Sequence, residues 1–322
     1  MINITHNANI FLEKNKDIPL IVYGSGDSGY WIGYYLNMCN YDWAFYIDKS
    51  VNGEGATLHG KNIFSPDKFK DYVGKSFRII VASVQYQSVV YDLLKLTNKY
   101  NINIECFIPI YERKMFLKEE TYYGEKYDIN KFLAYFRRKL LKSQSISFVA
   151  NNCIAGHFYE MAGILMSSPT INTGLTPEDF IKLCKSPQKY LNMDIKCDRM
   201  GFHNENNNES PNRLYPIGRL DDIEVHFVHE KTGQDAEDKW NTLRENVDFE
   251  NLIFLLADNH TNGIPIRVQK EFMELPQRHL LVINGKTKYC TSSYDVIQNL
   301  PYASLDKALE NYFDFVGWLN GD

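Results

Sequence analysis

Short apolar runs alternate with stretches of helical periodicity along residues 19–110. The runs at 19–23, 43–47, 78–82 and 104–108 suit buried strands and are too short for helices. Apolar residues recur at helical spacing between Tyr30 and Asn40, and again between Val89 and Lys99. Strands that alternate with helices form βαβ units, so the pattern predicts an α/β fold built on a parallel sheet.

The second half also alternates strands with helices. Apolar runs at 145–150, 252–257 and 279–283 predict strands, and residues 223–229 are interpreted as a further strand. Asp128 and Thr176 are typical helix N-caps ahead of amphipathic stretches. The chain between the halves is polar and charged. We therefore expect a first domain at residues 1–112, a linker at 113–127 and a second α/β domain at 128–322.

Composition narrows the class of protein. The 322 residues are 44% hydrophobic and 23% charged, which is typical of two globular domains. A net charge of −5 argues against nucleic acid as a partner. The sequence shows no long apolar run and no basic leader, so we expect no membrane span, no secretion signal and a cytoplasmic location. The six cysteines form no CxxC pair, so neither a metal site nor a disulfide framework is expected. A small-molecule substrate is expected, and a homo-oligomer is left open.

A glycine-rich loop follows the first strand. Residues Gly24–Gly29 read GSGDSG and match GxGxxG, with Gly24, Ser25, Gly26 and Gly29 as candidate ligand-binding residues. Such a loop lets the backbone approach a phosphate at a helix N-terminus, and Asp48 at the next strand end could accept a ribose hydroxyl. Alternatively the glycines only shape a tight turn. Asp27 within the loop would repel a phosphate.

Cys153 has the setting of a nucleophile. It follows the strand at 145–150 and precedes a helix, where the helix dipole would lower a thiol pKa. The amides of Asn151 and Asn152 could stabilise an oxyanion, and His157 lies four residues further along. The alternative is a small buried residue without chemistry.

Two histidines at 226 and 229 are the candidate bases. In one continuous strand their side chains point to opposite faces, so they would not share a metal ion. We favour His226, oriented by Glu224 or Asp222, and keep His229 as the second candidate. Asp258 joins the predicted catalytic group because it follows the buried strand at 252–257. Open α/β sheets bind their ligands at the carboxyl ends of strands.

The first half resembles the small Rossmann-like domains at the N-terminus of bacterial sugar acyltransferases and epimerases. The resemblance is carried by the glycine loop, FYID at 45–48, GKNIFSPDKF at 60–69 and IVAS at 80–83. It implies a nucleotide-sugar pocket near Gly24–Gly29, Asp48 and Ser83, without hydride chemistry.

The second half, from about 145 to 290, resembles the bacterial family of domain of unknown function nineteen-nineteen, found among exopolysaccharide and capsule biosynthesis proteins. The matching segments are FVANNCIAG at 148–156, SP at 168–169, PEDFIK at 177–182, YPIGRLDDIEVHFVHE at 215–230 and AEDKW at 236–240. Ile154, Ala155 and Glu230 depart from the usual Trp, Gly and Tyr. The resemblance supplies a glycan-biosynthesis setting and no mechanism.

These observations lead to a hypothesis of acyl transfer to a sugar or nucleotide sugar. Cys153 would carry the acyl group, His226 or His229 would act as base, and a coenzyme A thioester or a nucleotide sugar would be the bound cofactor. In a variant of this mechanism the histidine deprotonates the sugar directly. The first alternative is a non-catalytic nucleotide-sugar or glycan-binding scaffold. The second is an NAD-dependent oxidoreductase, which rests on the glycine loop alone.

Overall fold

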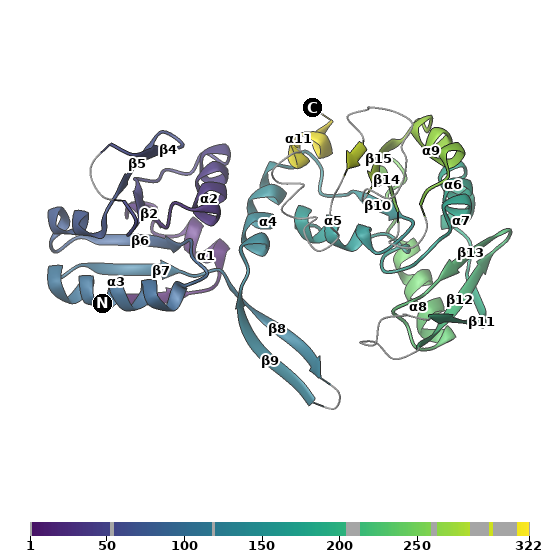
Figure 1. Ribbon diagram of the computed structural model, residues 1–322, viewed down its shortest axis with the longest axis horizontal. Coiled ribbons are helices and arrows are strands. Elements are labelled where there is room, and N and C mark those ends of the chain that lie inside the picture. Colours follow the sequence, from purple (N-terminus) through teal and green to yellow (C-terminus); the bar gives the residue numbers. More distant parts are fainter. Residues whose placement is uncertain are drawn as a thin grey trace. The chain divides into compact units, whose positions relative to one another are not determined.

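The computed structural model describes residues 2–51, 55–117, 120–203, 213–258, 263–283, 296–298 and 314–321. Its contacts divide the chain into two compact units, Met1–Leu140 and Leu141–Asp322 (Figure 1). Each unit is an α/β assembly with a mainly parallel sheet, so the predicted fold class is confirmed.

The N-terminal unit is built on a seven-stranded sheet in the order β1-β7-β6-β2-β3-β5-β4. All neighbours pair in parallel except β4 and β5, which are antiparallel. The strands are β1 (Ile2–Thr5), β2 (Leu20–Tyr23), β3 (Tyr46–Ile47), β4 (Thr57–Leu58), β5 (Lys61–Phe64), β6 (Ser76–Val81) and β7 (Asn103–Phe107). Because β3 and β6 flank β2 on its two sides, their carboxyl ends meet beside the glycine loop.

Helices cover both faces of this sheet. They are α1 (Ala8–Glu13), α2 (Asp27–Met38), the 3₁₀ helix η1 (Pro66–Tyr72), α3 (Tyr86–Tyr100) and α4 (Ile129–Leu140). On one face, Leu93 of α3 shares a core cluster with Ile21 of β2. On the other, Phe107 of β7 contacts Phe11 of α1 and Phe132 of α4, with ring centroids 5.5 and 4.6 Å apart. The alternation of side chains along β7 explains this division.

The segment expected as a linker, 113–127, forms most of a hairpin. Strands β8 (Ile110–Leu117) and β9 (Glu120–Tyr127) pair antiparallel along their length. Helix α4, which we expected to open the second domain, packs in the first unit, where Arg137 donates to the Tyr35 hydroxyl at 3.0 Å. A charged sequence is compatible with a hairpin because backbone hydrogen bonds pair its strands.

The described residues of the C-terminal unit form two sheets. The parallel sheet has the order β10-β14-β15-β16, and the antiparallel sheet has the order β11-β12-β13. The strands are β10 (Ser147–Ala150), β11 (Lys196–His203), β12 (Arg213–Leu220), β13 (Ile223–His226), β14 (Leu252–Ala257), β15 (Arg278–Ile283) and β16 (Val296–Gln298). The helices are α5 (Ile154–Ala162), α6 (Pro177–Lys185), α7 (Pro187–Leu191), α8 (Gly233–Arg244), α9 (Ile266–Met273) and α11 (Phe315–Asn320).

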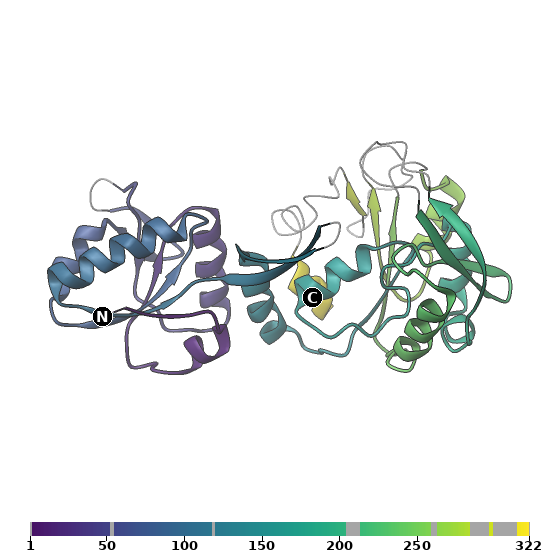
Figure 2. The same ribbon diagram turned by 90° about the horizontal axis from the view of Figure 1, so that it is seen from below.

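The parallel sheet of this unit is buried on both faces. Phe148 and Leu280 share a cluster with α5 and α11, in which Phe158 and Phe315 lie 5.6 Å apart. Phe254 and Leu281 share the other cluster with residues of α6, α8 and α9. Helix α8 lies beside the antiparallel sheet in both views (Figures 1 and 2). Both sheets therefore contribute to one core beside the end of β10.

A search of the described residues for a helix that could cross a membrane finds none of sufficient length and apolar character.

Candidate functional site

Cys153 lies at the start of α5, as the sequence predicted. Strand β10 ends at Ala150 and α5 begins at Ile154, with Cys153 as its N-cap. The Asn152 side-chain oxygen accepts a hydrogen bond from the Ile154 backbone N–H at 3.0 Å. This bond satisfies one of the N–H groups that a helix leaves unpaired at its start. Asn152 therefore fixes the turn that presents the thiol.

The Asn151 side chain is engaged with the neighbouring strand. Its oxygen accepts from the Ala257 N–H and its nitrogen donates to the Ala257 carbonyl, each at 2.8 Å. Asn151 is 2% exposed, and the Asn152 amide also donates to the Ala257 carbonyl, at 3.4 Å. The two amides expected as oxyanion donors thus tie the carboxyl end of β10 to that of β14. Their geometry is that of positioning residues.

His229 contacts Cys153. The Cys153 Sγ and His229 Nε2 atoms are 3.2 Å apart, within reach for proton transfer between thiol and imidazole. The predicted strand at 223–229 is too long: β13 ends at His226, and the Glu230 N–H donates to the Phe227 carbonyl at 3.1 Å in the turn that follows. Because the chain turns there, strand alternation does not govern the direction of His229.

His226, the base that we favoured from the sequence, has other partners. Its Nδ1 lies 3.2 Å from the Tyr215 hydroxyl, and its backbone exchanges two hydrogen bonds of 2.8 Å with Gly174. Burial lowers the pKa of His226, and Glu224 opposes that effect. The structure thus brings His229 to the thiol and His226 to Tyr215.

An ion pair that the sequence did not reveal involves Glu230, the residue directly after His229. The Lys239 Nζ lies 2.6 Å from Glu230 Oε1, and the two side chains are only 19% and 15% exposed. Burial raises the pKa of Cys153, while the charge of Lys239 and the residue's own N–H lower it and Glu230 raises it. The expectation of a lowered thiol pKa was wrong, because desolvation exceeds the effect of the helix terminus.

The acidic candidates are arranged differently from the prediction. Asp222 accepts a hydrogen bond from the Tyr190 hydroxyl at 2.7 Å, and Glu224 pairs with Arg199 at 2.5 Å, so both are engaged outside the Cys153–His229 pair. Asp258 is 3% exposed at the end of β14, where its N–H donates to the Val282 carbonyl at 3.1 Å. The neighbouring 259–260 segment lies outside the described residues.

The glycine loop of the N-terminal unit borders a second polar region. A pocket of about 310 Å³ opens at the carboxyl ends of β2, β3 and β6. The two Asp48 carboxylate oxygens accept four hydrogen bonds from the backbone and hydroxyls of Ser25 and Ser50, at 2.7–2.9 Å. Burial raises the pKa of Asp48, but these bonds outweigh burial and leave the pKa below its usual value. The carboxylate expected to bind a ribose is occupied in shaping the loop.

The glycines of the loop fall into two groups. A Cβ on Gly29 would lie 2.0 Å from the Gly24 carbonyl oxygen, and one on Gly24 would lie 2.6 Å from the Ala82 oxygen. Gly24 also has a φ of +111°, in the region that favours glycine. A Cβ on Gly26, by contrast, would meet nothing within 4 Å. Ser83 lines the same pocket and accepts from the Gln85 N–H at 3.1 Å.

Comparison with models of known protein families finds a match for the larger part of the chain. Residues 124–320 match the family model described as Domain of unknown function (DUF1919). The chain belongs to the DUF1919 family. This confirms the predicted family and extends its limits beyond 145–290. An "Uncharacterized protein" of Haemophilus influenzae is similar to the chain, with 22% identity over 194 residues that cover 60% of this chain and 84% of the relative.

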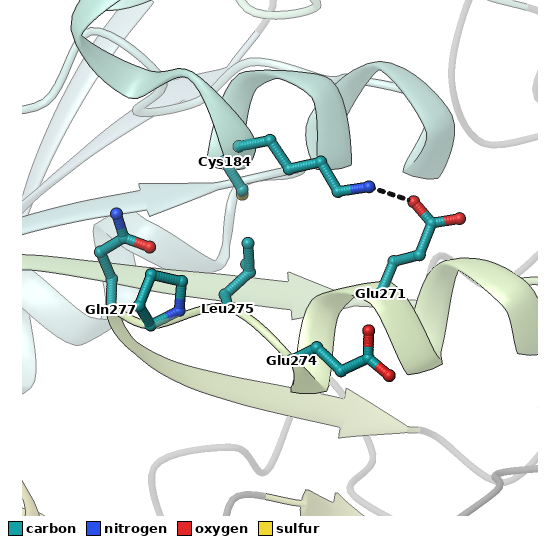
Figure 3. Close-up of a pocket in the computed structure, with 7 residues that line it drawn as sticks. Cys184, Glu271, Glu274, Leu275 and Gln277 are labelled. Atoms are coloured by element: carbon teal, nitrogen blue, oxygen red, sulfur yellow. Dashed lines mark hydrogen bonds and ion pairs between the residues drawn. The ribbon is translucent and has the colours of Figure 1, made fainter.

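The DUF1919 region contains another pocket, away from Cys153. Figure 3 shows it between α6 and α9, lined by Cys184, Leu275 and Gln277, with Lys185 paired to Glu271 at 2.5 Å. Its thiol is wholly buried, and burial raises the pKa of Cys184 well above its usual value. None of the predicted site residues lines this pocket. Within the described part of the chain, no group of three His, Cys, Asp or Glu residues is arranged to hold a metal ion.

Proposed function

We propose that the DUF1919 unit is a thiol-dependent transferase that moves an acyl group from a thioester to a sugar hydroxyl, in surface-glycan biosynthesis in the cytoplasm. The observation that supports it is the 3.2 Å contact between Cys153 Sγ and His229 Nε2 at the start of α5. A nucleophile with a base in reach is the minimal requirement for covalent acyl transfer.

The first half-reaction forms an acyl-enzyme. The Cys153 sulfur attacks the thioester carbonyl carbon while His229 Nε2 takes the thiol proton. The tetrahedral intermediate then expels the donor's thiolate, which receives that proton from His229. The backbone N–H groups at the start of α5 supply positive potential for the oxyanion.

The second half-reaction returns the enzyme to its starting state. A sugar hydroxyl attacks the acyl carbon, His229 takes the hydroxyl proton, and the Cys153 thiolate leaves and recovers that proton. The side chain of His229 is exposed, so an acceptor can reach it from solvent. Burial raises the pKa of Cys153, so the proposed mechanism uses His229 to take the thiol proton rather than a preformed thiolate.

The test is acyl-enzyme formation by the full chain with a panel of acyl-coenzyme A thioesters, followed by intact-mass and peptide analysis. We expect a thioester adduct on Cys153 that sugar acceptors discharge. Cys153→Ala should abolish the adduct, and His229→Ala should slow its formation about 100-fold or more. Cys39→Ala, which removes a half-buried thiol of the other unit, is the matched control.

Three outcomes would contradict this mechanism. Transfer that persists in Cys153→Ala would favour direct deprotonation of the sugar by a histidine. Absence of adduct and of transfer with every thioester would favour the non-catalytic alternative. A larger loss in His226→Ala than in His229→Ala would reassign the base to the histidine beside Tyr215.

A second candidate function is recognition of a nucleotide sugar or related hydroxyl-rich ligand by the N-terminal unit. It is favoured by Gly26, which has open space beside it, and by the Tyr23 hydroxyl, which is buried without a hydrogen-bond partner among the described residues. Both residues line the pocket at the glycine loop.

Thermal-shift measurements with nucleotide sugars, free sugars, nucleotides and NAD(H) test this candidate. A ligand at about 100 times its Kd adds about 2.7 kcal/mol to the stability of the unit that binds it. Gly26→Val would fill the open space and should abolish the shift without unfolding the unit. A shift with NAD(H) alone would instead favour the oxidoreductase alternative.

A further inference from the structure

The turn that carries His229 is anchored on both sides to one helix. Phe227 is fully buried, and its ring lies 6.4 Å from that of Trp240 in an edge-on contact. Glu230 pairs with Lys239 at 2.6 Å. The exposed His229 is therefore flanked by two residues that are held by consecutive positions of α8.

Helix α8 is itself rigidly placed. Its N-cap Thr232 accepts from the Asp235 N–H at 3.1 Å, and a Cβ on Gly233 would lie 2.8 Å from the Cys197 carbonyl oxygen. Ala236 and Trp240, one turn apart, are fully buried, and the Trp240 indole donates to the Met193 carbonyl at 3.0 Å. A helix held in this way can fix the position of a charged group that extends from it.

The Lys239–Glu230 pair is mostly buried, and it is asymmetric. One carboxylate oxygen of Glu230 binds the ammonium, while Oε2 is buried and has no hydrogen-bond partner among the described residues. A half-satisfied buried pair is costly to a fold, so its position next to His229 is better explained by a role at the Cys153–His229 pair. Of the groups that act on Cys153, His229 is in contact and accepts or donates a proton, the charge of Lys239 favours a sulfur anion and that of Glu230 opposes it.

We propose that Lys239 is the positioning residue of the Cys153–His229 pair: it holds the His229 turn through Glu230 and stabilises the sulfur anion that forms as His229 takes the proton. This inference rests on the proposed function for its chemical purpose. The charge effect itself can be measured without any substrate.

The experiment measures the rate at which iodoacetamide alkylates Cys153 in the full chain, by peptide mass mapping. The pH is varied from about 6 to about 10, a range that brackets the ordinary pKa of a cysteine thiol. Lys239→Met keeps most of the stem and removes the charge. We expect its alkylation profile to move upward by about one pH unit, a tenfold smaller thiolate fraction at a given pH below the midpoint. Lys239→Arg should restore the wild-type profile, because it keeps the charge.

Two further variants separate charge from structure. Lys231→Met removes the same charge from an exposed position in the same segment, and it should leave the profile unchanged. Lys239→Met combined with Glu230→Gln leaves no unpaired buried charge, so it keeps a testable protein if the single variant unfolds. We expect a smaller upward movement in the double variant, because the opposing charge is lost as well.

An alkylation profile of folded Lys239→Met that coincides with wild type, or with Lys231→Met, would overturn the inference. So would a Lys239→Arg profile that moves as far as the Lys239→Met profile does. Failure of acyl transfer alone is a different result: it would remove the proposed function and leave the charge effect on Cys153 in place. Acylation at Cys153 together with an unchanged Lys239→Met alkylation profile would support the proposed function and remove the role of Lys239.

Discussion

The chain has the same local arrangement after β2 and after β10: a parallel strand leads through a short polar turn into a helix. Asp48, which directly follows β3, lies beside the first turn, and Ser25 of that turn together with Ser50 occupies both of its carboxylate oxygens. In the second, the side chain presented is Cys153, whose sulfur contacts an exposed histidine. Similar topology thus yields one turn that hydrogen-bonds a neighbouring carboxylate within the fold, and another turn whose reactive sulfur contacts a base.

The difference shows that a strand-end motif does not itself identify a reactive site. Both turns offer a helix N-terminus, and open α/β sheets place ligands at such ends. What separates them is whether the polar atoms are already bonded within the fold. Each turn can be tested on that point by substitution.

The largest expected effect concerns the glycines of the first turn. Gly29→Ala should destabilise the N-terminal unit by about 3 kcal/mol, because its Cβ would overlap the Gly24 carbonyl oxygen. Gly26→Ala should change stability by less than about 0.5 kcal/mol, since nothing lies within 4 Å of its Cβ. Urea unfolding followed by hydrogen exchange of peptides from β2 and α2 measures both. Equal losses in the two variants would contradict the division of the glycines.

The next effect concerns the Asp48 carboxylate. Asp48→Asn replaces an acceptor oxygen by an amide nitrogen and should cost about 2 kcal/mol, since hydrogen bonds to a charged group are the stronger ones. The folded pKa lies below the ordinary value of 3.8, so the carboxylate's stabilisation is full above that value and is lost as pH falls through the folded pKa. Denaturation midpoints between neutral pH and about pH 2 should thus fall less steeply in Asp48→Asn than in wild type. Parallel curves would mean that Asp48 does not hold the loop through its charge.

The alternation of apolar runs was sufficient to predict the α/β fold, the positions of β2, β6, β10 and β14, and the place of Cys153 at the start of α5. These features depend on local pattern. The contact with His229 could not be predicted in this way, because it requires the chain to leave β13 after His226. Phe227, at the start of that turn, packs against Trp240, and this contact is tertiary.

The role of Asp48 and the Lys239–Glu230 pair escaped prediction for related reasons. Asp48 was correctly located at a strand end. The hydroxyls that hydrogen-bond to its carboxylate belong to Ser25, far before it in the sequence, and Ser50, just after it, so these bonds are visible only in three dimensions. Glu230 and Lys239 are separated by a turn and the first part of α8. The available signal was the position of Lys239 directly before a tryptophan on an amphipathic helix, which indicates a stem lying along apolar surface.

The smallest expected effect concerns a polar group beside the first turn that has no hydrogen-bond partner among the described residues. The Tyr23 hydroxyl is that group: the residue is 2% exposed, and desolvation raises its pKa above the usual range. Tyr23→Phe should therefore stabilise the N-terminal unit by about 1 kcal/mol, because it removes a buried polar atom without a partner among the described residues. Urea denaturation of the two proteins without ligand measures this gain, with Tyr91→Phe, on an exposed ring of α3, as the control. A loss of stability in Tyr23→Phe would mean that the hydroxyl is already paired. The same substitution can also be tested for its effect on the thermal shift given by a nucleotide sugar. If stability rises and that shift weakens, the first turn also keeps one polar atom for a ligand. The two turns then both have a function and differ in the kind of chemistry they perform.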